Sequence, residues 1–476
     1  MKSLAIYLNF TWLLAVSLIS IACTSDDGEV TDNNISVDKT ELLYATAGGS
    51  ESINIKCSAN IAWGVKTDAD WLLVSKTSGV GTTMLSIEAS ANNSEEPRTA
   101  IVTVFTVDKS LEIEVTQEAT AQSISPDASG MSDFTAVELS EIMGVGWNVG
   151  NSLDAVGGET AWGNPTINKE LIDAVKSAGF NTVRIPVAWS NYIEEGDENF
   201  TISNEGLLRV EEVVNYVLEN DMFAMVNIHW DGGWMQPTYE EQEDVNDRLN
   251  KMWRQIAIHF RDYDYHLIFA GTNEVMVEGD YGTPTEEYYS VQNSFNQTFI
   301  TTVRQTGGRN SYRYLTVQGF NTNIDHTVNF AEIPEDSVED RMFMEVHYYD
   351  PYEFTLDVSN DNIWQWGEIA TDPSATASWG GEEWLATQFQ KMYDNFVSQG
   401  IGVILGEYGA SYRADIPEAE AYREYYYEQT TQEALEHQIV PVIWDNGYPD
   451  NHQMGLFDRN DGTEYFPDLI DAITDN

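Results

Sequence analysis

Two glutamates stand out because each lies at the end of an apolar run of the sequence. Glu274 ends the run 266–274, and Glu407 lies near the end of the run 401–408. Two carboxyl groups that face one sugar linkage can hydrolyse it, since one protonates the leaving oxygen while the other attacks the anomeric carbon. A separation of about 5–5.5 Å gives retention of configuration, and a wider one gives inversion. The pair therefore predicts glycoside hydrolysis.

Further polar and aromatic side chains fall at the ends of other apolar runs. A charged group in such a place must find a partner, because burying an unpaired charge is costly. Taken alone, the arginine could be a structural ion pair and each histidine a hydrogen-bonded structural residue. Taken together, the residues indicate one functional rim. They are Arg184, His229, Asn273, His347, Tyr349 and Trp444.

The elements that must position these residues begin at Phe134, where apolar runs alternate with helical patterns. Eight such repeats predict an α/β fold, the (β/α)8 TIM barrel, in which catalytic groups collect at the carboxyl ends of the strands. A doubly wound sheet would carry a glycine-rich phosphate turn after its first strand, and Gly150-Asn151-Ser152 lacks that spacing. The eight runs are 144–151, 181–187, 223–229, 266–274, 314–320, 342–349, 401–408 and 439–446.

The preceding residues follow a different pattern. Short alternating strands and turns over 34–118 predict an all-β, immunoglobulin-like sandwich. Its motifs are Trp63, 69–72, the Gly79/Gly81 turn, Arg98 and 115–117. They resemble the BACON domain of Bacteroidetes, which implies a carbohydrate-binding module or a spacer. Trp63 and Trp71 are then either core residues or platforms for sugar rings. Residues 119–131 are rich in Ser, Ala and Asp and predict a linker, which leaves 132–476 for the barrel.

The barrel segment resembles glycoside hydrolase family 5, the retaining, endoglucanase-like cellulase family A. The resemblance extends over essentially all of 134–476. It departs from the usual family pattern at Val275, where proline is common, and at Trp230, where many relatives carry a second histidine. The matching motifs are 146–151, 183–187, His229, Asn273-Glu274, 347–349, 406–409 and Trp444.

This resemblance implies a role for each matching residue. Glu274 would be the acid/base and Glu407 the nucleophile of a two-step double displacement. Asn273 would bond the sugar 2-hydroxyl, and Tyr349 and Arg184 would keep the nucleophile ionised.

The resemblance extends to the groups that contact the sugar. His347 and His229 would orient the neighbouring groups and bond the sugar, and Trp444 would form the floor under the attacked ring. The stretch 318–323 resembles a sugar-contacting loop of the endoglucanase-type members, with Asn321 as the contact.

The predicted activity is that of an endo-β-1,4-glucanase acting on cellulose-like, mixed-linkage or xyloglucan chains. A β-mannanase, a strict xyloglucanase, a non-catalytic glycan-binding surface protein and a structural lipoprotein are the alternatives. No cofactor is expected. No metal is expected either, because metal-dependent barrel hydrolases carry a His-x-His pair on their first strand, and 146–150 offers no ligand.

Composition and the first residues bear on partners and location. A net charge of −55 disfavours nucleic acid and polyanionic sugars but not a neutral β-glucan. Residues 1–22 predict a lipoprotein signal peptide, with 20–23 similar to a lipobox and Cys23 as the lipidated residue. An ordinary secretory signal is the alternative. We expect a monomeric cell-surface or outer-membrane lipoprotein of a Gram-negative bacterium, which touches the membrane only through its anchor.

Overall fold

The computed structural model describes residues 35–46, 48–90, 92, 97–119, 124–359 and 361–475. The expected signal peptide and Cys23 lie outside these residues. The chain divides into two compact units, of which one is built mainly from Gly49–Ala89 and Thr99–Thr116 and the other mainly from Gln117–Asn476. Among the helices so described, none combines the length and the apolar character needed to cross a membrane.

The first unit is a β-sandwich. Its strands are β1 Ser36–Val37, β2 Glu41–Tyr44, β3 Gly49–Lys56, β4 Ala62–Thr67, β5 Leu72–Val74, β6 Ser78–Val80, β7 Thr83–Ala89, β8 Arg98–Phe105 and β9 Ser110–Gln117. They form one sheet in the order β1-β3-β7-β5 and another in the order β2-β9-β8-β4-β6. Buried and exposed residues alternate along β3, β7, β8 and β9, so each sheet turns one face to a shared core. The predicted sandwich is confirmed.

Two tryptophans of the sandwich had been open to two interpretations. Trp63 is buried, and its Nε1 donates to the carbonyl oxygen of Gly81 at 2.9 Å. It is therefore a core residue and presents no free face to a sugar. Trp71 and Cys57 are partly buried and pack against the same core.

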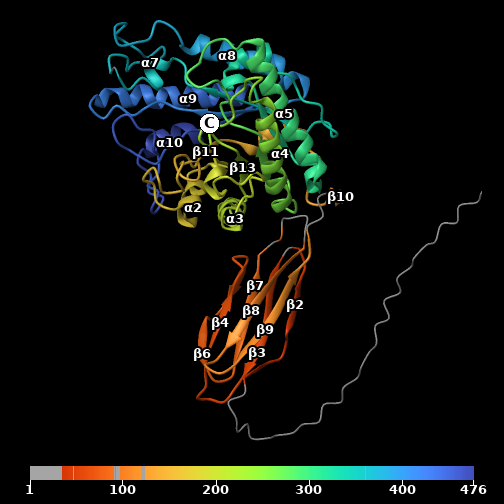
Figure 1. The fold of residues 1–476 in the computed structure, drawn as a ribbon. Helices are drawn as coiled ribbons and strands as arrows, with labels where there is room; N and C mark the ends of the chain where they lie inside the picture. Colours follow the sequence, from red (N-terminus) through yellow and green to blue (C-terminus); the bar gives the residue numbers. More distant parts are fainter. Residues whose placement is uncertain are drawn as a thin grey trace, which may run out of the picture. The chain divides into compact units, whose positions relative to one another are not determined.

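The second unit is a closed barrel of eight parallel strands, coloured yellow to blue in Figure 1. The predicted (β/α)8 fold is confirmed. The strands are shorter than the apolar runs that predicted them, because the ends of those runs form the loops of the rim. They are β11 Gly146–Asn148, β12 Thr182–Ile185, β13 Phe223–Asn227, β14 Leu267–Ala270, β16 Leu315–Gln318, β17 Met342–Tyr348, β18 Gly402–Tyr408 and β19 Ile439–Ile443.

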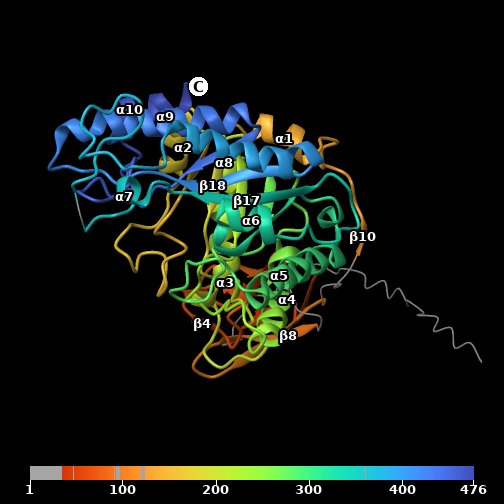
Figure 2. The same ribbon diagram turned by 90° about the horizontal axis from the view of Figure 1, so that it is seen from above.

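Helices surround the strands, and Figure 2 shows α8 (Glu382–Asn395) and α9 (Glu420–Glu436) beside β17 and β18, which they contact through aromatic rings. Several begin at side-chain caps, such as Ser203 before α3 and Thr285 before α5, which satisfy free backbone N–H groups. The helices are α1 Ala136–Met143, α2 Lys169–Ser177, α3 Asn204–Leu218, α4 Gln242–His259, α5 Glu286–Gln305, α6 Ile324–Phe330, α7 Tyr352–Thr355, α8 Glu382–Asn395, α9 Glu420–Glu436 and α10 Pro467–Thr474, with short 3₁₀ turns η1 Trp189–Tyr192, η2 Arg309–Ser311, η3 Phe320–Thr322, η4 Val397–Gln399 and η5 Pro417–Ala419.

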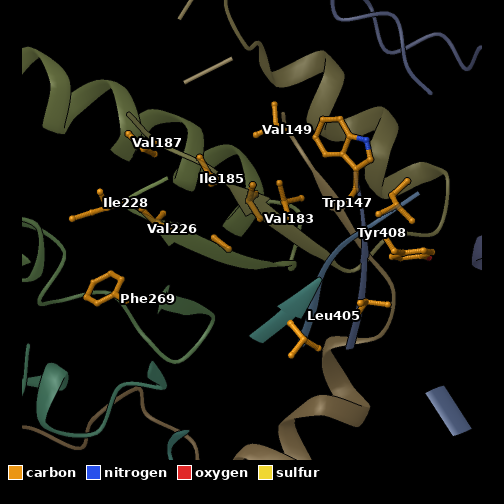
Figure 3. Close-up of a cluster of buried hydrophobic side chains, with 14 of the residues drawn as sticks. Trp147, Val149, Val183, Ile185, Val187, Val226, Ile228, Phe269, Leu405 and Tyr408 are labelled. Carbon is orange, nitrogen blue, oxygen red and sulfur yellow. The ribbon is translucent and has the colours of Figure 1, made fainter. Parts of the chain in front are cut away.

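The barrel has two apolar cores because both faces of its strands are buried. One core fills the space between strands and helices, and Figure 3 shows part of it, including Trp147, Ile185, Val226 and Leu405. The other lies inside the barrel, where α1 contributes Ala136, Leu139 and Met143. Helix α1 therefore closes the amino-terminal end of the barrel, and the carboxyl end of the strands is left for polar groups.

The segment expected to be a linker contains a short strand. Strand β10, Ile124–Pro126, pairs in parallel with β15, Gly307–Gly308, which lies between α5 and β16. A Cβ on Gly307 would come within 1.8 Å of the carbonyl oxygen of Ile124, so the close pairing needs glycine there. This part of the segment is therefore attached to the barrel.

Candidate active site

Glu274 reaches the barrel mouth because its strand has already ended. Strand β14 stops at Ala270, and Glu274 adopts a left-handed backbone conformation with φ of 46°. This conformation is unfavourable for a residue other than glycine and is held here by the backbone N–H of Glu274, which donates to Gln318 Oε1 at 3.1 Å. Asn273 and Glu274 can therefore both face the mouth, although neighbours on a strand point to opposite faces.

Glu407 reaches the mouth through a β-bulge. Pairing between β17 and β18 runs from Val346 opposite Leu405 to His347 opposite Glu407, so Gly406 is the extra residue. Its carbonyl oxygen accepts from the amide of Asn148 at 2.8 Å. Without the bulge, regular alternation would turn Glu407 towards the helices. The bulge turns its carboxylate inwards.

Arg184 is fully buried at the centre of the polar cluster. Its guanidinium lies 2.9 Å from Glu407 Oε1 and 2.9 Å from Glu345 Oε1. It also donates to the amide oxygens of Asn148 and Asn273. This last contact holds the amide oxygen of Asn273 on the arginine, so its N–H groups lie on the other side of the amide.

His347 connects the two predicted catalytic residues. Its Nδ1 lies 2.7 Å from Glu274 Oε1 and 3.7 Å from Glu407 Oε2, and its Nε2 lies 3.1 Å from Glu345 Oε1. One carboxylate oxygen of Glu274 and one of Glu407 are within 4.8 Å of each other. The side chain of Glu274 is 39% exposed and that of Glu407 only 7%, so Glu274 is the more accessible of the two.

The aromatic groups of the rim lie around the same cluster. The hydroxyl of Tyr349 donates to Glu407 Oε2 at 3.2 Å. The ring of His229 stacks on Trp444, with ring centroids 5.8 Å apart and planes 6° apart. Trp444 itself is half-buried and follows directly after β19.

Asn321 lies in the loop that follows β16. It has φ of 51°, and its backbone N–H donates to the carbonyl oxygen of Val275 at 2.9 Å. The loop of Asn321 is therefore attached to the loop that carries Glu274. All the residues predicted for the site between Arg184 and Trp444 thus belong to loops or strand ends at one end of the barrel.

Comparison with known proteins adds a second, independent observation. A family model described as cellulase, glycosyl hydrolase family 5, matches residues 148–450. The chain belongs to glycosyl hydrolase family 5. A model described as a viral BACON domain matches residues 34–120, which confirms the predicted nature of the sandwich.

Among individual relatives, the chain is similar to a xyloglucan-specific endo-β-1,4-glucanase from Bacteroides ovatus, 38% identical over 97% of this chain and 94% of the relative. It is also 40% identical to endoglucanase A of Paenibacillus barcinonensis, over 73% of this chain and 91% of the relative. A solved Bacteroides ovatus xyloglucanase of the family, in complex with a XXXG heptasaccharide, matches with a TM-score of 0.71 and 37% identity over 93% of this chain and 99% of that chain. The protein is therefore a glycoside hydrolase of family 5.

The two carboxyl groups of this family 5 site differ in pKa. Burial raises the pKa of Glu407 to about 6, with the charge of Glu274 adding to the effect and His347 and Arg184 opposing it. Burial also acts to raise the pKa of Glu274, but the hydrogen bond and charge of His347 outweigh it, so the pKa of Glu274 is lowered. Glu274 and Glu407 interact closely, so neither titrates independently of the other. At a pH between the two pKa values, the pair carries one proton.

The pKa shifts of His347, His229 and Tyr349 indicate the charge state of each of these neighbouring groups. Burial acts to lower the pKa of His347, but the charge of Glu407 and the hydrogen bonds to Glu274 and Glu345 raise it to about 9, so the ring is an imidazolium. Burial, with the charge of Arg184, lowers the pKa of His229 well below its usual range, so this ring is neutral. Burial and the charge of Glu407 raise the pKa of Tyr349, which therefore stays a donor.

Glu274, His347 and Glu407 are also of the residue types that bind metals. However, both nitrogens of His347 already face carboxylates, and the two cations Arg184 and His347 match three carboxyl groups of which Glu274 and Glu407 share one proton. Because side chains compensate the charge here, a metal-free site remains our expectation.

Several residues of the cluster were not among those predicted. Glu345 lies between Arg184 and His347, Asn148 joins Arg184 to Gly406, and Gln318 holds the backbone of Glu274. Glu345 had a detectable signal, since it is a charge inside the apolar run 342–349 and must be paired when buried. Asn148 and Gln318 lie within the motif 146–151 and the stretch 318–323, but they are uncharged, and neither was singled out as a partner of Arg184 or Glu274.

Proposed function

We propose that the protein is a retaining endo-β-1,4-glucanase in which Glu274 is the acid/base and Glu407 the nucleophile. The observation that carries this proposal is the facing pair of carboxylates, with one oxygen of each within 4.8 Å of the other. A close approach of this kind is in keeping with retaining enzymes, whose carboxyl groups lie about 5–5.5 Å apart, whereas inverting enzymes need a wider gap for a water molecule.

In the first step, Glu407 attacks the anomeric carbon and forms a covalent glycosyl–enzyme bond. The bond from that carbon to the leaving oxygen breaks, and Glu274 gives this oxygen its proton. The exposed position of Glu274 suits contact with the departing chain, and the buried position of Glu407 suits attack from inside the mouth. In the free site the raised pKa of Glu407 and the lowered pKa of Glu274 favour the shared proton on Glu407, so this step uses the other form of the pair, in which Glu274 carries the proton and Glu407 is ionised.

In the second step, Glu274 acts as a base. It takes a proton from water, the water oxygen bonds to the anomeric carbon, and Glu407 leaves as a carboxylate. His347 contacts Glu274 at 2.7 Å and lies 3.7 Å from Glu407, so its positive charge stabilises whichever carboxyl group is ionised.

The remaining residues would bind the sugar next to the attacked bond. Asn273 would donate to the 2-hydroxyl, because its amide oxygen is held by Arg184. Trp444 would support the apolar face of the ring, with His229 stacked beside it. Asn321 would contact a neighbouring sugar from the loop attached to Val275.

We infer that the substrate class is a neutral β-1,4-glucan, with xyloglucan as the first candidate. The support is the similarity, over nearly the whole chain, to the xyloglucan-specific relative from Bacteroides ovatus. An unbranched or mixed-linkage β-glucan is the second candidate, because the Paenibacillus barcinonensis relative is an endoglucanase.

Digestion of xyloglucan, carboxymethylcellulose, mixed-linkage glucan and glucomannan, with product masses and anomeric NMR, tests the proposal. We expect oligosaccharides of several sizes early in the reaction and a first-formed β-anomer. Glu407→Ala should remove hydrolysis, whereas the control Glu243→Ala, on the exposed face of α4, should not. Full activity of Glu407→Ala, or a first-formed α-anomer, would contradict the mechanism.

We also propose the domain limits and the location. Residues 1–22 would be a lipoprotein signal peptide, Cys23 the lipidated residue, 34–118 a BACON domain, 119–131 a connecting segment and 132–476 the catalytic domain. The BACON domain and the Bacteroides relative fit extracellular glycan degradation. A monomer anchored in the outer membrane is the finer proposal, and Cys23→Ser should move the protein from the membrane fraction to the soluble fraction.

A further inference from the structure

A third glutamate lies directly beneath the predicted catalytic pair. Glu345 is fully buried on β17, two residues before His347, so both side chains point into the barrel. One of its oxygens, Oε1, lies 2.9 Å from Arg184 Nη2 and 3.1 Å from His347 Nε2. Glu345 is thus bonded to two groups that themselves contact Glu407 and Glu274.

The space for this carboxylate comes from a glycine. A Cβ on Gly406 would lie 2.1 Å from Glu345 Oε1 and 2.6 Å from its carboxyl carbon, distances that atoms cannot share. The carboxylate cannot swing away cheaply, because Arg184 and His347 hold it. Gly406 is also the bulge residue that turns Glu407 inwards. One glycine therefore both orients the nucleophile and makes room for the buried anion.

We propose that Glu345 is a positioning residue for the reaction, which holds His347 and Arg184 against the catalytic glutamates. Position 406 is then glycine because the Glu345 carboxylate occupies the place of a side chain. This inference rests on the proposed roles of Glu274 and Glu407. Glu345 accepts from Nε2 of His347 and so fixes the ring with Nδ1 towards Glu274. It touches no sugar and acts through its neighbours.

The charges around Glu345 determine what its removal does. The groups that face it or its partners are Arg184 on β12, Glu274 after β14, Gln318 on β16, His347 on its own strand and Glu407 on β18. Its negative charge acts to raise the pKa of both Glu274 and Glu407, and its hydrogen bond acts to raise that of His347. Without this charge, all three should release their protons at lower pH.

The test is Glu345→Gln, which keeps the shape and removes the charge. We expect both limbs of the kcat/KM profile against pH to move to lower pH by up to about one unit, because Glu345 is one of the charges that act to raise the pKa of Glu274 and Glu407. On a glucan that the wild type degrades, kcat/KM on the alkaline limb should then fall by up to about tenfold, and the loss at the wild-type optimum should be smaller.

A matched control is Asp336→Asn, which breaks the buried bond of Asp336 to Arg304 outside the site. This variant should lose thermal stability and keep both limbs in place. If Glu345→Gln also loses only stability, with limbs and kcat unchanged, Glu345 is merely structural and the inference is overturned. A wild type that degrades no glucan contradicts the proposed function instead, so the two failures are distinct.

A double-mutant cycle, measured as thermal stability, tests whether the Glu345 carboxylate occupies the space that a side chain at position 406 would need. Gly406→Ala should destabilise the wild type strongly and the Glu345→Ala variant much less, because the methyl group then enters the vacated space. If Gly406→Ala alone does not fold, recovery of folded protein in the double variant is the same positive result. Additive losses, or a double variant that also fails to fold, would overturn the claim that Glu345 determines the glycine.

Discussion

Replacement of Arg184 by methionine tests how much the buried ion pairs of the site contribute to the stability of the barrel. The guanidinium lies 2.9 Å from both Glu345 and Glu407, and it is completely buried. Removing one partner of a buried ion pair costs about 3–5 kcal/mol, because the remaining charge stays in a poorly solvated place. The free energy of unfolding of a domain is only about 5–15 kcal/mol, so Arg184→Met should lose a large part of it.

The loss should depend on pH in a defined direction. In the wild type, burial acts to raise the pKa of Glu345, but Arg184 and His347 outweigh it and the pKa lies below the ordinary 4.5. A carboxyl group with a lowered pKa stabilises the fold above its unfolded value, and this contribution is lost as the pH falls through the folded value. Without Arg184 the effect of burial gains weight, so the difference between variant and wild type should grow as the pH rises above 4.5.

The assay is urea denaturation at pH 5 and pH 8. It follows the transition in which the barrel loses its tertiary structure. Arg304→Met is the matched control, since Arg304 is also buried and paired, with Asp336 at 2.8 Å. Both variants should be destabilised, but only Arg184→Met should also lose hydrolysis under conditions where it is folded. An Arg184→Met variant as stable as the wild type at pH 8 would refute the reasoning.

Three further predictions concern the site and the barrel. Tyr349→Phe removes the hydrogen bond to the Glu407 carboxylate, which is worth about 1.5–3 kcal/mol, so kcat/KM should fall about tenfold or more. Unchanged kinetics would exclude this bond from catalysis. In the wild type, kcat/KM should decline on the alkaline side with an apparent pKa of about 6, as the pair loses its last proton; a decline that begins only above pH 8 would disagree. Leu139→Ala in α1 should lower the free energy of unfolding by about 2–5 kcal/mol with KM unchanged, and a smaller loss would mean that α1 does not close the core tightly.

Much of this protein could be predicted from its sequence because strand ends carry visible signals. Arg184, His347 and Glu407 are polar residues in runs that are otherwise apolar, and the alternation of runs with helical patterns was sufficient to predict the barrel. The carboxyl ends of parallel strands meet at one end of a barrel, so the residues had to be neighbours.

The geometry that makes these neighbours a site was not predictable in the same way. The bulge at Gly406 and the left-handed backbone of Glu274 depend on contacts between strands that are far apart in the sequence. Glu345 was overlooked because it lies inside a run and not at its end. The linker prediction rested on composition alone, which carries no information about the pairing of Ile124–Pro126 with Gly307–Gly308.

The closure of the barrel by α1 bears on the path by which water reaches the site. Ala136, Leu139 and Met143 place buried apolar groups at the end opposite the acidic cluster. We therefore expect water to reach the carboxylates through the mouth that the glucan also occupies. The water molecule that ends each catalytic cycle and any sugar hydroxyl that competes with it as acceptor must then use one entrance. We therefore expect the balance between hydrolysis and transfer to another sugar to depend on the loops of the rim, and changes at the base of the barrel to act mainly on stability.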